Sequence, residues 1–313
     1  MQIIYSTHNL SLPQSIATIG FFDGVHLGHQ YLIKQLIAEA QKRQLASVVV
    51  TFSDHPANII HNKRIELLTP LEEKLTLLSK ENIDYCIVLP FTKELSALSA
   101  RTFMEQILKK ELNVHALYIG YDNRFGHRLS NKEGFEDYVS YGKECGVEII
   151  EAKALLLKEI EISSSLIRNL LKEGNLSLAN KLLGRPYTLV GNVTFGKRIG
   201  RTLGYPTANI KPAHQQKVIP SDGVYAVSVR LNGSRYRGML NIGCRPTIKN
   251  GKTKTIEVHI LDFQREVYQQ DIELVFEKYL RKEIEFKDKK ALIEQLQKDE
   301  ETVRHFFENK KQP

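Results

Sequence analysis

Two histidines at close spacing are the first chemical signal in the sequence. His26 and His29, with Gly28 between them, lie in the segment 18–30, which follows a short apolar run and precedes an amphipathic one. This order predicts a strand, a glycine turn and a helix start, with both imidazoles on one face of the first turn. Backbone N–H groups at a helix N-terminus attract anions, and a glycine lets a phosphate approach closely. The segment therefore predicts a site for nucleotide phosphates, where histidines can donate hydrogen bonds to developing charge.

Other polar segments of the first half also follow apolar runs. Segment 51–56 comes just after the second strong run, segment 120–126 follows the fourth, and segment 162–168 opens a helical pattern with serines and an arginine. Serines at such a position are usually helix caps, and the arginine is either a surface residue or a triphosphate clamp. An isolated H-x-G-H pattern can also be a pair of surface histidines, so these further segments strengthen the prediction of a nucleotide site.

The first half of the chain alternates apolar strands with amphipathic helices. After the first strand, the expected strands are 46–52, 85–89, 116–119 and 147–151, and the expected helices are 29–43, 71–82, 101–112 and 134–145. Segment 69–72 is typical of a capping box with proline at the first helical position. The alternation predicts an α/β domain with a Rossmann-like, doubly wound parallel sheet, in which ligands bind at the carboxyl ends of the strands.

The second half has a different pattern, which begins near 184–186. The expected elements are short helices at 165–172 and 176–183, strands at 188–195, 224–231, 236–241, 255–261 and 272–279, and a final helix from about 289 to 307. Asn232–Gly233 and Asn250–Gly251 are hairpin signals. The pattern predicts a small antiparallel β-barrel with a terminal helix, and thus two domains, 1–184 and 185–313.

Segment 191–209 is the main chemical signal of the second half. It nearly matches a Walker A loop, but Arg198 stands where that motif needs Ser or Thr and the surrounding pattern is β, so a P-loop is rejected. Its glycines predict a mobile, backbone-rich loop that can wrap phosphates. After Pro206, Thr207 and Asn209 offer neighbouring oxygen ligands suited to Mg²⁺, although the alternative is a proline turn with local side-chain caps.

Composition and charge narrow the class of protein. The 313 residues are 42% hydrophobic and 26% charged, which is typical of a globular chain of about two domains. Three widely spaced cysteines without metal-ligand spacing indicate a reducing compartment and argue against zinc or disulfides. No signal peptide or membrane-length apolar run is evident, so we expect a cytoplasmic protein without a membrane partner. The net charge of +8 comes from basic residues mixed with acids, which favours a solvated surface with a few phosphate-binding cations over a nucleic-acid partner.

Segments 20–29 and 162–168 resemble the signatures of the bacterial flavin adenylyltransferases, which belong to the H-x-G-H nucleotidyltransferase superfamily. His55–Pro56 and segment 120–126 are similar to that family as well. The resemblance implies transfer of AMP from ATP to the phosphate of FMN, with FAD and pyrophosphate as products.

The same resemblance implies roles for individual residues. His26 and His29 would bind ATP phosphates and stabilise charge, Arg168 would grip the β/γ end with two serines, and Mg²⁺ would bridge phosphate oxygens. The binding residues implied are Gly20, Phe22, Asp23, Gly24, Gly28, His55, Pro56, Asp122, Ser164 and Ser165. Phe21 stands where the family often has Asn, Asn123 stands where an aromatic residue is frequent, and Ser165 replaces a frequent Thr. These departures bear on fine specificity, because both histidines and the arginine are present.

Several segments of the second half resemble the riboflavin kinases. They are 191–209, 222–225, 241–247, 257–262, Leu280–Arg281 and Phe286. The resemblance implies a six-stranded antiparallel barrel, with Glu257 as general base for the ribityl 5′-hydroxyl and Thr207 and Asn209 as holders of Mg²⁺–ATP. Glu257 alone would be taken for a solvent-facing strand carboxylate. The binding residues implied are Gly191, Gly196, Gly200, Thr207, Asn209 and Arg281.

The two resemblances together span about residues 18–304, in the order found in the bacterial bifunctional riboflavin kinase/FMN adenylyltransferase (FAD synthetase) family. We therefore expect phosphorylation of riboflavin to FMN and then adenylylation of FMN to FAD, each with Mg²⁺ and ATP. The alternatives are a chain with only one of the two activities, a flavin-sensing or nucleic-acid-binding module on an inactive scaffold, and a related nucleotidyltransferase with another acceptor. Self-association is left open by the sequence.

Overall fold

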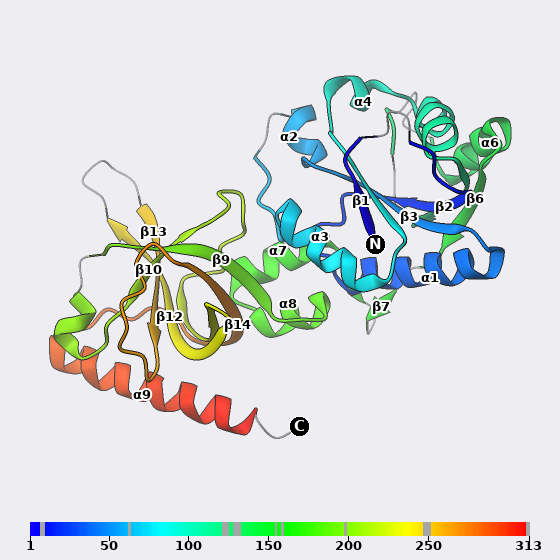
Figure 1. The fold of residues 1–313 in the computed structure, drawn as a ribbon. Coiled ribbons are helices and arrows are strands. Elements are labelled where there is room, and N and C mark those ends of the chain that lie inside the picture. The colour runs from blue at the N-terminus through cyan, green and yellow to red at the C-terminus, as the bar shows by residue number, and fades with distance from the viewer. Residues whose placement is uncertain are drawn as a thin grey trace. The chain divides into compact units, whose positions relative to one another are not determined.

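The chain folds into two compact units, Met1–Ser164 and Ser165–Pro313, in a computed structural model (Figure 1). The structure describes residues 1–6, 10–61, 64–120, 125–127, 133–153, 155–157, 160–196, 199–246 and 252–310. Asp122, Asn123 and the expected Asn250–Gly251 turn lie outside these residues. The first unit is a helix-covered parallel sheet and the second an antiparallel barrel with a final helix, which confirms the predicted fold class.

The sheet of the first unit has six parallel strands in the order β1-β4-β3-β2-β5-β6. Their bounds are β1 Gln2–Ile4, β2 Ser15–Ile19, β3 Ala46–Phe52, β4 Tyr85–Leu89, β5 Val114–Gly120 and β6 Glu148–Ala152. The chain steps from β2 to β3 and β4, and then crosses to β5 on the other side of β2. The order therefore reverses next to β2, which is where doubly wound sheets bind ligands.

Helices cover both faces of this sheet. Helices α1 (Leu27–Arg43) and α3 (Leu71–Leu78) pack on one face, and α5 (Ala100–Phe103), the π-helical η2 (Met104–Glu111) and α6 (Phe135–Cys145) pack on the other. All five residues of β2 are buried, as expected for a strand covered on both sides. The smaller elements are α2 (Pro56–His61), η1 (Ser79–Glu81), α4 (Lys93–Ala97), β7 (Leu156–Leu157) and β8 (Ile160–Glu161).

The capping box expected at 69–72 does not form. Helix α3 begins at Leu71, so Pro70 is its N-cap residue and has no side-chain hydrogen bond to the helix. The Thr69 hydroxyl instead accepts a hydrogen bond from the Gly24 N–H at 2.8 Å and donates to the Asp23 carboxylate at 3.3 Å. Thr69 therefore supports the histidine turn and not its own helix.

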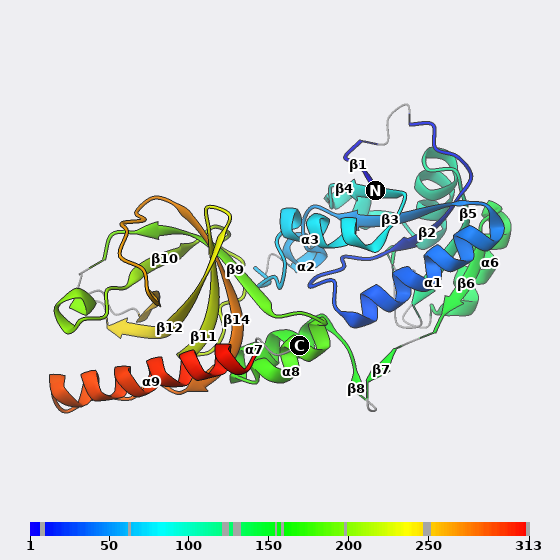
Figure 2. The ribbon, with the colours of Figure 1, turned by 60° about the horizontal axis from the view of Figure 1, so that its bottom comes forward.

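The second unit is a closed barrel in the order β10-β13-β12-β11-β14-β9, preceded by two helices and followed by one (Figure 2). Its elements are α7 Ser164–Glu173, α8 Leu176–Leu183, β9 Tyr187–Thr194, η3 Ile199–Leu203, β10 Ala208–Pro212, β11 Gly223–Leu231, β12 Ser234–Pro246, β13 Lys252–Ile260, β14 Asp271–Arg281 and α9 Lys289–Asn309. Every strand pairing is antiparallel. The Asn232–Gly233 hairpin forms as predicted, with positive φ at both residues.

Helix α9 is held on the barrel by its apolar face and by the ion pair between Arg281 of β14 and Asp299 of α9. Val303 and Phe307 pack with the barrel residues Met239 and Leu261. None of the helices in the described part of the chain combines the length and apolar character needed to cross a bilayer.

Candidate active sites

The histidine pair lies at the start of α1, as predicted. His26 is the N-cap residue, and its Nδ1 accepts a hydrogen bond from the His29 N–H at 3.3 Å. The two rings stack with centroids 3.6 Å apart, and His26 is only 4% exposed. Gly28 lies against this stack, since a Cβ there would be 3.2 Å from the His26 ring. The turn thus presents helix N–H groups and two stacked imidazoles at one point.

His29 is held in its neutral form. Burial, then the neighbouring His26 and then Lys74 lower the pKa of His29 well below its ordinary value. Its Nδ1 is buried and finds no hydrogen-bond partner among the described residues. A neutral imidazole can donate one N–H to a phosphate oxygen without first losing a proton.

The backbone of the turn is strained. Phe22 and Val25 have φ values of +55° and +38°, in the left-handed region that non-glycine residues seldom adopt, and Gly24 has φ of +83°. Such conformations persist at functional sites only where the surrounding structure imposes them. The Asp23 carboxylate supplies part of that support, because it accepts hydrogen bonds from the backbone N–H groups of Leu68 and Thr69 at 3.0 and 2.9 Å.

Asp23 is therefore placed as a support for the turn. It is 2% exposed, and both of its carboxylate oxygens face backbone N–H groups of the protein. Its own carbonyl accepts a hydrogen bond from the Ser164 hydroxyl at 2.8 Å. Ser164 is the first residue of α7, and Ser165 and Arg168 follow it on that helix. The Arg168 guanidinium donates to the Ser165 hydroxyl at 3.3 Å.

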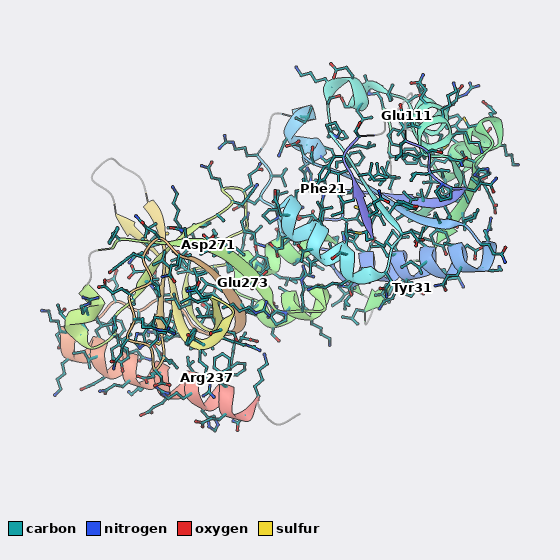
Figure 3. The ribbon with its side chains drawn as sticks, viewed as in Figure 1. Phe21, Tyr31, Glu111, Arg237, Asp271 and Glu273 are labelled. Atoms are coloured by element: carbon teal, nitrogen blue, oxygen red, sulfur yellow. The ribbon has the colours of Figure 1, made fainter. Side chains whose placement is uncertain are left out.

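An apolar cavity of about 310 Å³ opens beside the histidine turn, at the carboxyl ends of β2, β3 and β4. Phe21, labelled in Figure 3, lines it together with the expected binding residues Gly20 and Pro56. The remaining lining is mostly aromatic and aliphatic: Ile19, Phe52, Phe91, Leu95, Ser96, Phe103, Phe125 and Gly126. The His55 ring meets the Phe21 ring edge-on, with centroids 4.7 Å apart. Phe21 thus serves as a wall of this cavity.

Sequence reasoning missed Lys74, which is the least expected residue near the turn. It is 1% exposed, and its ammonium lies 4.1 Å from the centre of the Phe21 ring. A signal was present, because Lys74 falls among Leu71, Leu75 and Leu78 at the spacing of the buried face of α3. A lysine on an apolar face indicates either a snorkelling side chain or a buried charge with partners.

The predicted kinase residues come together on two paired strands of the barrel. Asn209 of β10 is directly opposite Glu257 of β13. The Thr207 hydroxyl donates to Glu257 Oε2 at 3.1 Å. One carboxylate, one carboxamide and one hydroxyl thus meet although 50 positions separate Thr207 from Glu257. Within the described residues, no three His, Cys, Asp or Glu side chains gather as a metal-binding group.

Two of the expected glycines lie against this cluster. A Cβ on Gly196 would be 2.0 Å from the Asn209 amide nitrogen, and one on Gly200 would be 2.2 Å from the Tyr205 carbonyl. Only glycine lets the backbone pass this closely. Gly191 differs from the expectation of a loop residue. It is buried within β9, where a Cβ would meet Ile210 and the Lys211 carbonyl at 2.6 Å, so it serves close strand packing.

A second cavity, of about 460 Å³, adjoins the Thr207–Glu257 pair. Thr207 and Pro206 form one wall, and the connection between β13 and β14 supplies Arg265 and Tyr268. The Tyr268 ring stacks on Phe195 with centroids 4.3 Å apart, and Phe195 is 64% exposed. Sequence reasoning missed these aromatic and basic residues, which carry no motif.

Arg281 is engaged elsewhere in the barrel unit. Its guanidinium makes a bidentate ion pair with Asp299 of α9, with the shortest contact 2.6 Å, and also donates to the Lys282 carbonyl. Asp299 is 5% exposed. The structure thus joins Arg281 to the terminal helix, and its expected contact with substrate stays a prediction.

The comparisons with known proteins agree on both halves of the chain. The model of the FAD synthetase family matches residues 9–166, and that of the riboflavin kinase family matches residues 183–307. Proteins named bifunctional riboflavin kinase/FMN adenylyltransferase are similar over nearly the full length. The one from Listeria monocytogenes is 38% identical, with 98% of each chain covered, and the one from Escherichia coli K12 is 39% identical, again with 98% of each covered. A crystal structure titled as a macrolide-efflux protein from Streptococcus pneumoniae is 31% identical, with a TM-score of 0.86 and coverage of 96% of this chain and 98% of that one.

Proposed function

The chain belongs to the bifunctional riboflavin kinase/FMN adenylyltransferase family and makes FMN from riboflavin and FAD from FMN, and we propose that the two reactions use the two clusters described above. The Thr207–Asn209–Glu257 cluster would carry phosphorylation, and the His26–His29 turn would carry adenylylation. The functional boundary would fall at 184/185, after α8. One observation carries the proposal: each cluster lies beside its own cavity, in a different compact unit.

In the kinase reaction, Glu257 would act as general base for the 5′-hydroxyl of riboflavin. A carboxylate can take the proton as that hydroxyl attacks the γ-phosphoryl group of ATP. The Thr207 hydroxyl donates a hydrogen bond to Glu257 and would thereby orient the carboxylate before the proton is transferred. Phosphoryl transfer depends mainly on positioning and charge neutralisation, so little more is asked of the protein.

Thr207 and Asn209 would hold Mg²⁺ for this reaction. Their hydroxyl and carboxamide oxygens are hard donors of the kind Mg²⁺ takes alongside substrate phosphates. The closeness of Gly196 to Asn209 fits this role, because it leaves backbone and no side chain over the donors. The metal would neutralise phosphate charge when bound. The ATP would extend into the 460 Å³ cavity, where Arg201 and Arg265 offer positive charge.

In the adenylylation reaction, the FMN phosphate would attack the α-phosphate of ATP and pyrophosphate would leave. No general base is required, because the attacking phosphate is already ionised. His26 and the neutral His29 would stabilise the developing charge, and Ser165 and Arg168 would hold the leaving pyrophosphate. The apolar cavity beside Phe21 would receive the flavin ring, since its aromatic lining suits a flat, largely apolar ring system.

The setting of these reactions is proposed as well. We place the protein in the cytoplasm, in agreement with its free cysteines and its use of ATP. Its excess positive charge would serve phosphate-bearing substrates and solvation, with no nucleic-acid partner.

A pair of substitutions tests the assignment of the two sites. With riboflavin, ATP and Mg²⁺, the unaltered chain should form FMN and then FAD, followed by chromatography. Glu257→Gln should abolish FMN formation but leave the conversion of supplied FMN to FAD. His29→Ala should do the reverse. If either variant, while folded, loses both activities, the two-site proposal is wrong.

A further inference from the structure

Lys74 is a buried charge that neither reaction uses. A lysine normally keeps its ammonium in water, and burying it is unfavourable unless its hydrogen bonds are replaced. Here all three ammonium protons have an acceptor within the first unit: the Phe21 carbonyl at 3.0 Å, the Thr51 hydroxyl at 3.0 Å and the Phe52 carbonyl at 2.9 Å. This complete set of partners indicates a defined position for the ammonium.

The three acceptors lie where β2 and β3 separate. The strands pair up to Ile19 and Val50, and the Gly20 N–H still reaches the Val50 carbonyl at 3.1 Å. Beyond that point β3 continues to Phe52, whereas the segment that follows β2 enters the histidine turn. The Phe21 carbonyl is the last acceptor before the strained Phe22, and the Thr51 hydroxyl also donates to it at 3.1 Å. Lys74 therefore ties the end of β3 to the entry of the turn.

The same ammonium also faces the Phe21 ring. Its distance of 4.1 Å from the ring centre is that of a cation–π contact. The ring forms a wall of the 310 Å³ cavity and meets His55 on its edge. Lys74 thus fixes both the carbonyl and the ring of one residue, which lies between the phosphate-binding turn and the cavity.

We propose that Lys74 is a positioning residue for FMN adenylylation, which keeps the histidine turn and the apolar cavity in one fixed geometry. Its three donors are occupied within the protein, so it acts through Phe21 and not on the substrates. The inference rests on the proposed placement of adenylylation at the His26–His29 turn.

The charged surroundings of Lys74 give the proposal a pH signature. The ammonium is near the carboxylates of Asp23 and Asp54, the thiol of Cys86 and the imidazole of His29. Burial lowers the pKa of Lys74 to about 8, although those carboxylates and that thiol oppose the shift. Burial raises the pKa of Cys86 to about 12. As the pH rises through about 8, Lys74 therefore loses its proton before Cys86 does.

The main experiment replaces the ammonium with an apolar group of similar length. Lys74→Met should lower kcat for FMN adenylylation about 100-fold and raise KM for FMN, because a displacement of about 1 Å at a reacting centre has an effect of that size. Riboflavin phosphorylation by the same molecule should not change, and it reports that the barrel unit is intact. Lys80→Met, which removes an exposed charge nearby, should leave both activities unchanged.

A pH series separates positioning from simple stabilisation. In the unaltered protein, adenylylation should fall as pH rises through about 8, because the ammonium loses its proton. The stability of the first unit should rise over the same range, since the unfolded chain then binds more protons than the folded one. Lys74→Met should lack both trends. If Lys74 were purely structural, Lys74→Met would lower the unfolding temperature, but kcat and KM measured well below that temperature would not change.

The outcomes decide between the inference and its premise. A folded Lys74→Met with unaltered kcat, KM and pH profile overturns the inference. If this variant does not fold, Thr51→Val keeps the ammonium but removes the hydroxyl that links it to the Phe21 carbonyl. A loss of about fivefold in kcat, measured well below the unfolding temperature of this variant, supports positioning, and unaltered kcat refutes it. Should His29→Ala abolish adenylylation while both of these variants retain it, the inference fails but the site stands. Should His29→Ala retain adenylylation, the site itself is misplaced.

Discussion

The two candidate phosphate sites of this chain are built in opposite ways. The histidine turn is a strained backbone segment held by buried side chains, among them Asp23 and Lys74. The barrel site is an unstrained pair of strands, in which register places Asn209 opposite Glu257 and glycines leave room above them. Neither uses a Walker A loop. The comparison teaches that a phosphate site can be specified by side chains that support a turn, or by the absence of side chains over a sheet.

The two constructions should fail in response to different substitutions. Loss of a supporting side chain should impair the turn, whereas the addition of a methyl group should impair the barrel site. Because each unit has its own reaction, either activity serves as a control for the other. The following predictions use that contrast.

The largest effect is expected at Gly196 of the barrel site. Gly196→Ala would bring a Cβ to 2.0 Å from the Asn209 amide nitrogen. The amide can swing away, so the fold should survive, but the proposed metal ligand would be displaced. We expect FMN formation to fall at least about 100-fold, in line with the loss of a preorganised charge-stabilising contact, while FMN adenylylation stays unaltered. Steady-state kinetics of both reactions on one preparation measure this, and unaltered FMN formation would show that the Asn209 position is not needed.

A smaller effect is expected at Asp23 of the histidine turn. Asp23→Asn keeps the shape, but its amide has only one acceptor oxygen, so one of the backbone N–H groups of Leu68 and Thr69 loses its acceptor and the other loses a charged one. We expect the first unit to lose about 2 kcal/mol of unfolding free energy and adenylylation to fall about tenfold, with riboflavin phosphorylation unchanged. Denaturant unfolding and kinetics test both.

Asp137 offers a matched control for this substitution. Its carboxylate also accepts a backbone N–H, from Gly134 at 2.8 Å, but it does so at the exposed start of α6. Asp137→Asn should reduce stability by about 0.5 kcal/mol and leave adenylylation unaltered. If both variants behave alike, the turn is not specially dependent on Asp23.

The smallest effect is a pH dependence of stability in the first unit. The pKa of His29 is lowered in the folded protein, so the unfolded chain takes up a proton near pH 6.5 while the folded chain does not. Stability should therefore fall by about 1 kcal/mol as the pH drops from about 6.5 to 5.5. His29→Gln should remove this part of the dependence. Denaturant unfolding at several pH values measures it, and an identical slope in both proteins would contradict the neutral His29.

The fold was largely accessible from the sequence. Runs of apolar residues and hairpin signals predicted the parallel sheet and the barrel, because both patterns depend on local periodicity. Strand β1 was missed since it has three residues and is mostly exposed, and β10 was missed because its first residues, Ala208 and Asn209, belong to the Pro206–Asn209 motif. The helix expected at 101–112 contains a π-helical stretch, Met104–Glu111, which the pattern of apolar residues does not predict.

The sites were accessible only where spacing along the chain determines them. His26 and His29 lie on one helical turn, so their contact followed from local geometry. The supporting roles of Thr69 and Lys74 depend on the approach of segments 22 to 53 positions away, which a single sequence does not reveal. The pairing of Arg281 with Asp299 is tertiary in the same sense.

The closed barrel has a consequence for the history of this chain. Strand β13 is paired on one edge with β10 and on the other with β12. A one-residue insertion within β13 would move Glu257 to the opposite face of the sheet, and closure prevents the strand from sliding to compensate. Substitutions can therefore accumulate along these strands, but changes in length should survive only in the connections between them. The spacing of Glu257 from the start of its strand is expected to be the most slowly changing distance in the barrel, whatever happens to the residues around it.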